Sequence, residues 1–118
     1  MTVFVELAVS GVTGHVVGIV GRGVDGVPVQ GAHDQTNRAI ERLRDLLERH
    51  GAGMDSVVRL RVYLTEMTDW STTVLPLVSA GWASKIPPCT VVGIAALVEP
   101  WMRVEFEVDI AMPVINGA

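Results

Sequence analysis

The fold is decided by two segments, Pro87-Pro88-Cys89-Thr90-Val91-Val92-Gly93-Ile94-Ala95-Ala96-Leu97 and Val104-Glu105-Phe106-Glu107-Val108-Asp109-Ile110-Ala111. The prolines stop a preceding helix, and the run that follows them carries no charge, which predicts a buried strand. Glu99-Pro100 interrupts the chain between the segments. The second segment alternates apolar and charged residues, so it predicts a strand with one buried face and one polar face.

The composition indicates one domain, residues 1–118, with more apolar surface than a monomer of this size needs. Hydrophobic residues make up 49% of the chain and the mean hydropathy is +0.41, although no apolar run reaches the roughly 18 residues of a membrane span. The surplus therefore predicts a subunit interface and no membrane. Nine basic and thirteen acidic residues give a net charge of −4 without any basic block, which makes nucleic acid an unfavourable partner.

The cysteine and histidine content indicates the cellular compartment and argues against a metal site. A single cysteine, Cys89, cannot form an internal disulfide, and the first residues lack the features of a signal peptide, so a cytoplasmic location is expected. The three histidines are scattered without ligand spacing, and we expect no metal site.

The first third of the chain predicts three short strands, over residues 3–9, 15–20 and 27–30, with a turn at Ser10-Gly11. Residues 21–26, Gly-Arg-Gly-Val-Asp-Gly, match the GxGxxG dinucleotide fingerprint. No helix pattern follows them, so a pyrophosphate would lack its helix N-terminus. We therefore expect no cofactor and interpret Asp25-Gly26 as a hairpin turn.

Two helices and one further strand follow. Apolar residues step by three and four over residues 35–50, with Asp34 as the expected N-cap and Gly51 as the stop signal. Residues 56–64 alternate as a strand, with Val58 on the same face as Leu60. A second helix is expected from about 68 to 83, with a kink or a broken start at Pro76.

The order of elements, β-β-β-α-β-α-β-β, predicts a two-layer α+β domain. One mixed sheet of about six strands would carry two helices on a single face, since helices and strands here must bury their apolar sides against each other.

The quoted segments resemble the C-terminal signature of the Rid/YjgF family, the reactive intermediate deaminases, many of which are described as L-PSP endoribonucleases. The resemblance extends over roughly residues 15–112. It implies a chorismate-mutase-like subunit, a homotrimer, and small-molecule pockets between subunits.

The resemblance also assigns site residues. It implies that Glu105 activates the attacking water in imine hydrolysis and that the backbone of Gly21 borders the pocket. Thr90 and Val91 could offer backbone groups to the ligand. Deaminating members hold the substrate carboxylate with an arginine at the position of Cys89, and a thiol cannot replace its charged, forked donors. Hydrolysis of 2-imino acids is therefore not expected, and the ligand should be neutral or held by another cation.

Several residue interpretations stay open at this point. Cys89 is a small buried hydrophobe, a catalytic nucleophile, or a residue lining the pocket. Arg59 and Arg61 predict cross-strand ion pairs with Glu107 and Asp109. The function is either deaminase-type hydrolysis or tautomerisation, or a non-catalytic role in binding a metabolite or a partner protein.

Overall fold

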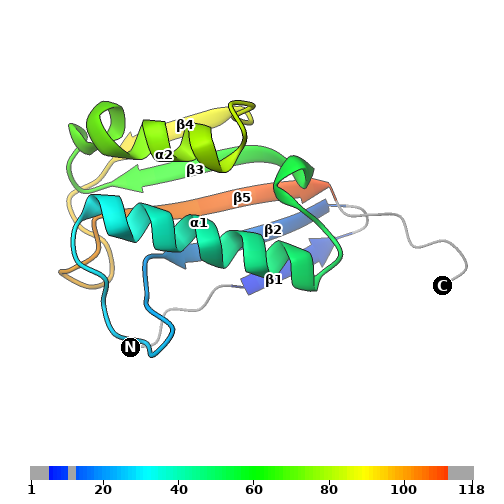
Figure 1. The fold of residues 1–118 in the computed structure, drawn as a ribbon, viewed down its shortest axis with the longest axis horizontal. Coiled ribbons are helices and arrows are strands. Elements are labelled where there is room, and N and C mark those ends of the chain that lie inside the picture. The colour runs from blue at the N-terminus through cyan, green and yellow to red at the C-terminus, as the bar shows by residue number, and fades with distance from the viewer. Residues whose placement is uncertain (1–5, 11–12, 112–118) are drawn as a thin grey trace, which may run out of the picture.

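The computed structural model describes residues 6–10 and 13–111. They form one sheet with two helices lying over one of its faces (Figure 1). The strand order is β1-β2-β5-β3-β4; β4 is parallel to β3 and the other neighbours are antiparallel. The predicted two-layer α+β fold with a mixed sheet is confirmed. The strands are β1 (Glu6–Ser10), β2 (Thr13–Val20), β3 (Val57–Leu64), β4 (Cys89–Gly93) and β5 (Val104–Ala111).

The described residues form five strands, and the predicted strand at Val27–Gln30 is not among them. Arg22 and Pro28 make a single bridge. Pro28 has no N–H, so the bridge does not extend into a ladder. Gly26, at φ 80°, closes a turn by donating to the carbonyl of Gly23 at 2.9 Å. The turn is confirmed, whereas residues 3–5 of the predicted first strand and Gly11 of its turn lie outside the described residues.

Helix α1 (Ala32–Arg49) begins three residues earlier than predicted. Gly31 is its N-cap, at φ 84° and without a side-chain cap, so the assignment of Asp34 to that role was wrong. Asp34 instead lies in the first turn, where its charge favours the helix dipole. Gly51, at φ 73°, ends the helix by donating to the carbonyl of Glu48, and Ala52 donates to that of Leu47.

The second helix has the broken start expected from Pro76. A π-helical turn, Trp70–Val74, leads into α2 (Leu75–Gly81), and Pro76 is the second residue of α2. The N–H of Leu75 donates to the carbonyl of Trp70, five residues back. A proline near the start of an α-helix costs little, because the N–H groups of the first turn have no partner within the helix. None of the helices in the described ranges is long and apolar enough to cross a bilayer.

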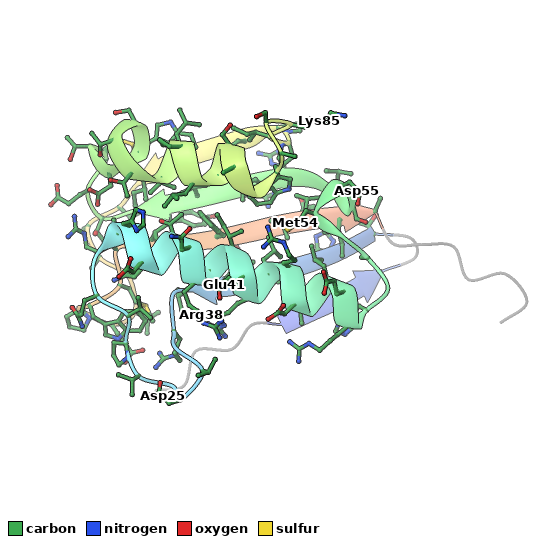
Figure 2. All side chains as sticks on the ribbon, viewed as in Figure 1. Asp25, Arg38, Glu41, Met54, Asp55 and Lys85 are labelled. Atoms are coloured by element: carbon green, nitrogen blue, oxygen red, sulfur yellow. The ribbon has the colours of Figure 1, made fainter. Side chains whose placement is uncertain are left out.

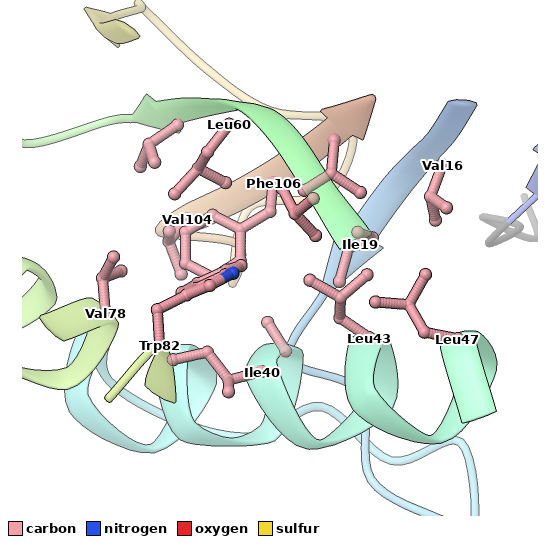
Figure 3. Packing of buried hydrophobic residues seen from close by; sticks show 14 of the residues in the cluster. Val16, Ile19, Ile40, Leu43, Leu47, Leu60, Val78, Trp82, Val104 and Phe106 are labelled. Carbon is pink, nitrogen blue, oxygen red and sulfur yellow. The ribbon is translucent and has the colours of Figure 1, made fainter. Parts of the chain in front are cut away.

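The core lies between the sheet and the two helices (Figure 3). Val104, Phe106, Val108 and Ile110 are each at most 1% exposed, as the alternation of β5 predicts. In β3 a bulge lies between Val57 and Arg59. It leaves the side chain of Val57 buried and that of Val58 50% exposed, so the predicted face of Val58 was wrong.

The expectation of a buried strand over Thr90–Leu97 was also wrong. The strand β4 ends at Gly93, lies beside β3 rather than β5, and forms an edge of the sheet with most of its residues exposed. Val92 is 37% exposed and Val98, in the following loop, is 56% exposed. An uncharged apolar run on an edge strand is a surface that a second chain can cover.

Candidate functional site

The face of the sheet opposite the helices carries a row of ionisable side chains. Glu105, Glu107 and Asp109 alternate with the buried core residues of β5 and are partly exposed. Arg61 and Tyr63 of β3 lie on the same face, because residues paired across a sheet point the same way and Leu60, Val62 and Leu64 point into the core. Most members of this row are paired with one another.

Asp109 is the best-paired carboxylate of the row. His15 Nδ1 lies 2.8 Å from one of its oxygens, and Arg61 donates to the other at 3.3 Å. Burial alone would raise the pKa of Asp109, but the hydrogen bonds from His15 and Arg61 outweigh it and hold that pKa below its ordinary value. Asp109 is therefore ionised at neutral pH and has a structural partner on each side.

The predicted ion-pair pattern is confirmed only for Arg61 with Asp109. Glu107 accepts a 2.5 Å hydrogen bond from the hydroxyl of Tyr63 instead of pairing with an arginine. This hydrogen bond is the main reason that the pKa of Tyr63 is raised. Arg59 donates to the hydroxyl of Thr90 at 3.4 Å. The phenol of Tyr63 was a partner that the charge pattern alone could not reveal.

Glu105 differs from the other carboxylates of the row. It lies between Val20 of β2 and Tyr63 of β3. Burial raises its pKa, and the neighbouring negative charge of Glu107 raises it further. Within residues 6–10 and 13–111 no side chain donates a hydrogen bond to its carboxylate. A carboxylate in this environment holds a proton more readily than usual, which is what a general acid or base requires.

Gly21 lies at the same end of the sheet as Glu105, directly after Val20. It packs so closely on the start of α1 that a Cβ at this position would stand 2.4 Å from the Cα of Gln35. The position therefore requires glycine for packing reasons alone. Its carbonyl accepts the N–H of Val29 at 3.3 Å. A role for its backbone in binding stays a prediction.

Gln35, to which the sequence pattern assigns no role, joins the loops around this end of the sheet. Its side chain is fully buried, and its amide nitrogen donates to the carbonyls of Val29 (3.0 Å) and Trp101 (2.7 Å). Its amide oxygen accepts the N–H of Arg103 at 2.8 Å. The sequence signal that could have identified Gln35 is its position: a neutral polar residue near the start of a helix, on the side that faces the core.

Arg22 and Glu99 connect the same two loops at their outer side. Arg22 donates to the carboxylate of Glu99 at 2.5 Å, and its guanidinium lies 5.2 Å from the centre of the Trp101 ring. The hydrogen bond from Arg22 is the main cause of the lowered pKa of Glu99.

Cys89 does not meet Glu105 within one chain. Cys89 pairs with Leu60, so it lies on the helix side of the sheet, whereas Glu105 pairs with Tyr63 on the open side. The two residues stand two strands and three residues apart, roughly 14 Å between backbones. Val91 shares the helix side with Cys89, and Thr90 lies on the open side beside Arg59.

The Cys89 side chain is exposed at the edge of the sheet, so its interpretation as a buried hydrophobe was wrong. Burial of part of the residue raises the pKa of its thiol, and no cation among the described residues opposes this shift. A nucleophilic cysteine needs the opposite shift. No group of three or more metal-ligating side chains occurs in the described part of the chain.

Comparisons with known proteins place this chain in a family. The model of the endoribonuclease L-PSP family matches residues 2–112, which is nearly the whole chain and more than the quoted motifs cover. A Mycobacterium tuberculosis protein described as a member of the highly conserved YjgF family shares 27% identity, with a TM-score of 0.78 over 90% of this chain and 84% of that one. The protein belongs to the endoribonuclease L-PSP family, also known as the Rid/YjgF family.

Other solved structures agree with this fold. A putative endoribonuclease from Thermotoga maritima is 26% identical, with a TM-score of 0.82 over 97% of this chain and all of that one. Yeast Mmf1 is 19% identical and shares the fold, with a TM-score of 0.83 over 91% of this chain and 85% of that one. No curated protein sequence matches the chain.

Proposed function

We propose that this protein is a homotrimer that binds a small molecule in pockets between its subunits and hydrolyses an imine or enamine there. The observation that carries the proposal is Glu105: a partly buried carboxylate with a raised pKa, to which no described side chain donates a hydrogen bond. Such a group is available to exchange a proton with a bound water.

The arrangement of the chain supports a site shared between copies. Cys89 and Glu105 lie on opposite faces of the sheet, so a pocket containing both needs a second copy. The uncharged, exposed edge of β4 and the apolar loop from Ile94 to Val98 supply a surface for that copy. Thr90 and Val91 on this edge, and Gly21 near Glu105, would then contribute backbone groups to the pocket.

The proposed reaction needs no cofactor. On a protonated imine, the Glu105 carboxylate takes a proton from water while the water oxygen bonds to the imine carbon, which gives a neutral carbinolamine. Glu105 then gives this proton to the nitrogen. The carbon–nitrogen bond breaks as the carbinolamine hydroxyl passes its proton to Glu105, which hands it to the departing ammonia, and the products are a carbonyl compound and ammonium. An enamine enters the same route after protonation at carbon.

Deaminating family members bind the carboxylate of their substrate through an arginine. The substrate of this protein should carry an uncharged group at the corresponding position. By the family resemblance, Cys89 stands at the position of the binding arginine, and its thiol offers only a weak donor. Arg59 lies nearby but on the other face of the sheet, so it does not replace that arginine within the same subunit. The net charge of −4 argues against RNA as a substrate.

An imine-hydrolysis assay tests the proposal. An amine oxidase would generate imines of simple primary amines, and an amino-acid oxidase would generate 2-imino acids. We expect the protein to accelerate carbonyl formation over buffer for the first class more than for the second. Glu105→Gln should remove the acceleration, by about 10²–10⁴-fold, whereas Glu107→Gln, the matched change on the same strand, should keep most of it. Equal rates in Glu105→Gln and wild type would contradict the proposal.

A non-catalytic role in metabolite binding is the second candidate. The raised pKa of the Cys89 thiol favours it, because this residue then supplies neither a nucleophile nor a charge. A trimer that accelerates neither class of imine, but binds a small molecule whose binding depends on Glu105, would support this alternative.

A further inference from the structure

A cavity of about 480 Å³ lies at the far end of the sheet from Glu105. Its walls come from the 3-10 turn Met54–Ser56, the first residue of β3 and the turn between α2 and β4. Figure 2 shows Met54, Asp55 and Lys85 toward the same end of the molecule. The volume is within the range of ligand pockets, roughly 300–1,000 Å³. This cavity, here called the Trp82 pocket, is lined by Met54, Asp55, Val57, Gly81, Trp82, Ala83, Lys85 and Pro87.

Hydrogen bonds between its walls hold the Trp82 pocket in shape. The indole N–H of Trp82 donates to the carbonyl of Met54 at 3.0 Å, which joins the end of α2 to the 3-10 turn. Within the second wall, the N–H of Lys85 donates to the carbonyl of Trp82 at 2.9 Å. Just outside the pocket, the N–H of Leu60 donates to the carbonyl of Pro88 at 2.8 Å. The cavity is therefore formed before any ligand binds, as is usual for small-molecule sites.

One wall carries backbone strain. Ala83 and Ser84 both have positive φ, 50° and 67°. They end α2 as Gly51 ends α1, with Ser84 donating to the carbonyl of Ser79 at 2.7 Å. Glycine adopts this conformation without cost, whereas an L-residue with a side chain does not. Retained strain of this kind occurs more often at ligand sites than elsewhere.

The two charged residues of the Trp82 pocket define its ligand. The remaining six lining residues are apolar or glycine. Asp55 and Lys85 form no ion pair with each other or with another described residue. One unpaired anion and one unpaired cation at an apolar cavity complement a zwitterion with an apolar body.

We propose that the Trp82 pocket binds a free α-amino acid with an apolar side chain. The ammonium group contacts Asp55, the carboxylate contacts Lys85, and the side chain packs on Trp82 and Val57.

The Trp82 pocket lies far from Glu105, although Pro87 in its lining stands two residues before Cys89. Val57 stands six residues before Tyr63 on β3, roughly 20 Å along the strand, and Tyr63 is the residue that pairs with Glu105. The Trp82 pocket also lies on the helix side of the sheet. Glu105→Gln should therefore leave amino-acid binding unchanged, so failure of one proposal does not decide the other.

An NMR titration with L-phenylalanine tests this inference. Lys85 is the only lysine of the chain, so reductive methylation with ¹³C-formaldehyde labels it and the terminal amine alone and preserves the charge. We expect a saturable shift of the Lys85 methyl signal. 3-Phenylpropanoate lacks the ammonium, and phenethylamine lacks the carboxylate. Each should bind with an affinity at least about tenfold lower than that of L-phenylalanine.

Variants make the test specific. Asp55→Asn should weaken L-phenylalanine binding roughly tenfold or more, while Asp45→Asn, an exposed change on α1, should not. Lys85→Gln, followed through the indole N–H signal of Trp82, should weaken it similarly. Unchanged spectra away from the pocket show that each variant is folded. The absence of a saturable shift in the wild type, or equal affinity of Asp55→Asn, would overturn the inference.

Discussion

The two faces of the sheet differ in how completely one chain covers them. Under the helices, β5 presents Val104, Phe106, Val108 and Ile110, all nearly without exposure. On the other face the same strand presents Glu105, Glu107 and Asp109, all partly exposed, and no described helix lies over them (Figure 1). The side chains of the covered face are buried by contacts within a single chain. The open face holds ionisable groups at intermediate burial, where pKa values shift and chemistry becomes possible.

The largest expected effect is on the covered face. Phe106→Ala should lower the free energy of unfolding by about 3–5 kcal/mol, because it removes a fully buried aromatic ring and leaves a cavity. Phe106→Leu, which keeps most of the volume, should cost clearly less. Urea unfolding would measure both. Similar stabilities for Phe106→Ala and wild type would mean that this face is not the main source of stability.

The next prediction concerns Cys89, at the β4 edge of the sheet. Cys89→Arg should raise hydrolysis of 2-imino acids about ten- to a hundredfold, because a charge-assisted hydrogen bond to the carboxylate contributes about 1.5–3 kcal/mol. Cys89→Lys is the matched control, since it adds charge without the fork of donors and should gain less. Keto-acid formation from freshly generated imines measures this. No gain in Cys89→Arg with an unchanged assembly would show that the pocket does not present this position to the substrate.

A smaller effect is expected for the ion pair on the open face. Arg61→Leu should cost about 1–2 kcal/mol at pH 7, because Asp109 stays partly buried with one partner fewer. Arg59→Leu, which loses only a long contact with Thr90, should change stability by less than about 0.5 kcal/mol.

The Arg61 effect should also depend on pH. The pKa of Asp109 is lowered in the folded protein, so the stability that it contributes is complete above the ordinary aspartate pKa, about 3.9, and is lost as the pH falls through the folded value. The difference between wild type and Arg61→Leu should therefore shrink below about pH 4. Thermal melts from pH 7 to pH 3 would measure it, and a constant difference would show that Asp109 does not mediate the effect.

The smallest predicted change in stability is a gain rather than a loss. The pKa of Glu105 is raised by burial and by Glu107, so folding opposes its ionisation at neutral pH. Glu105→Gln should stabilise the protein at pH 7 by about 1 kcal/mol or less, and this gain should disappear as the pH falls below the pKa of glutamate in the unfolded chain, about 4.3. Melting curves at pH 7 and pH 4 would measure the gain. Destabilisation at pH 7 would mean that Glu105 has a structural partner and is not held for chemistry.

The sequence pattern alone was enough to predict the amphipathic elements, which bury one face and expose the other. The alternation of β5 and the apolar stripe of α1 were predicted correctly, because period-2 and period-3.6 patterns follow directly from strand and helix geometry. The break before α2 followed from Pro76, which lacks an N–H. The resemblance of the quoted segments to the Rid/YjgF family is confirmed by the family model.

Tertiary structure decided everything that depends on which strands are neighbours. An uncharged run such as that after Cys89 predicts a buried strand, yet β4 is an exposed edge because, among the described strands, only β3 pairs with it. The bulge that turns Val58 outward has no signal in an alternating sequence. The registers Leu60–Cys89 and Tyr63–Glu105 put the two candidate residues on opposite faces, and a shift of one residue would have put them on the same face. The alternation of side chains along a strand is a local property of the sequence. The register between strands and the position of a strand at an edge depend on how all strands of the sheet pair.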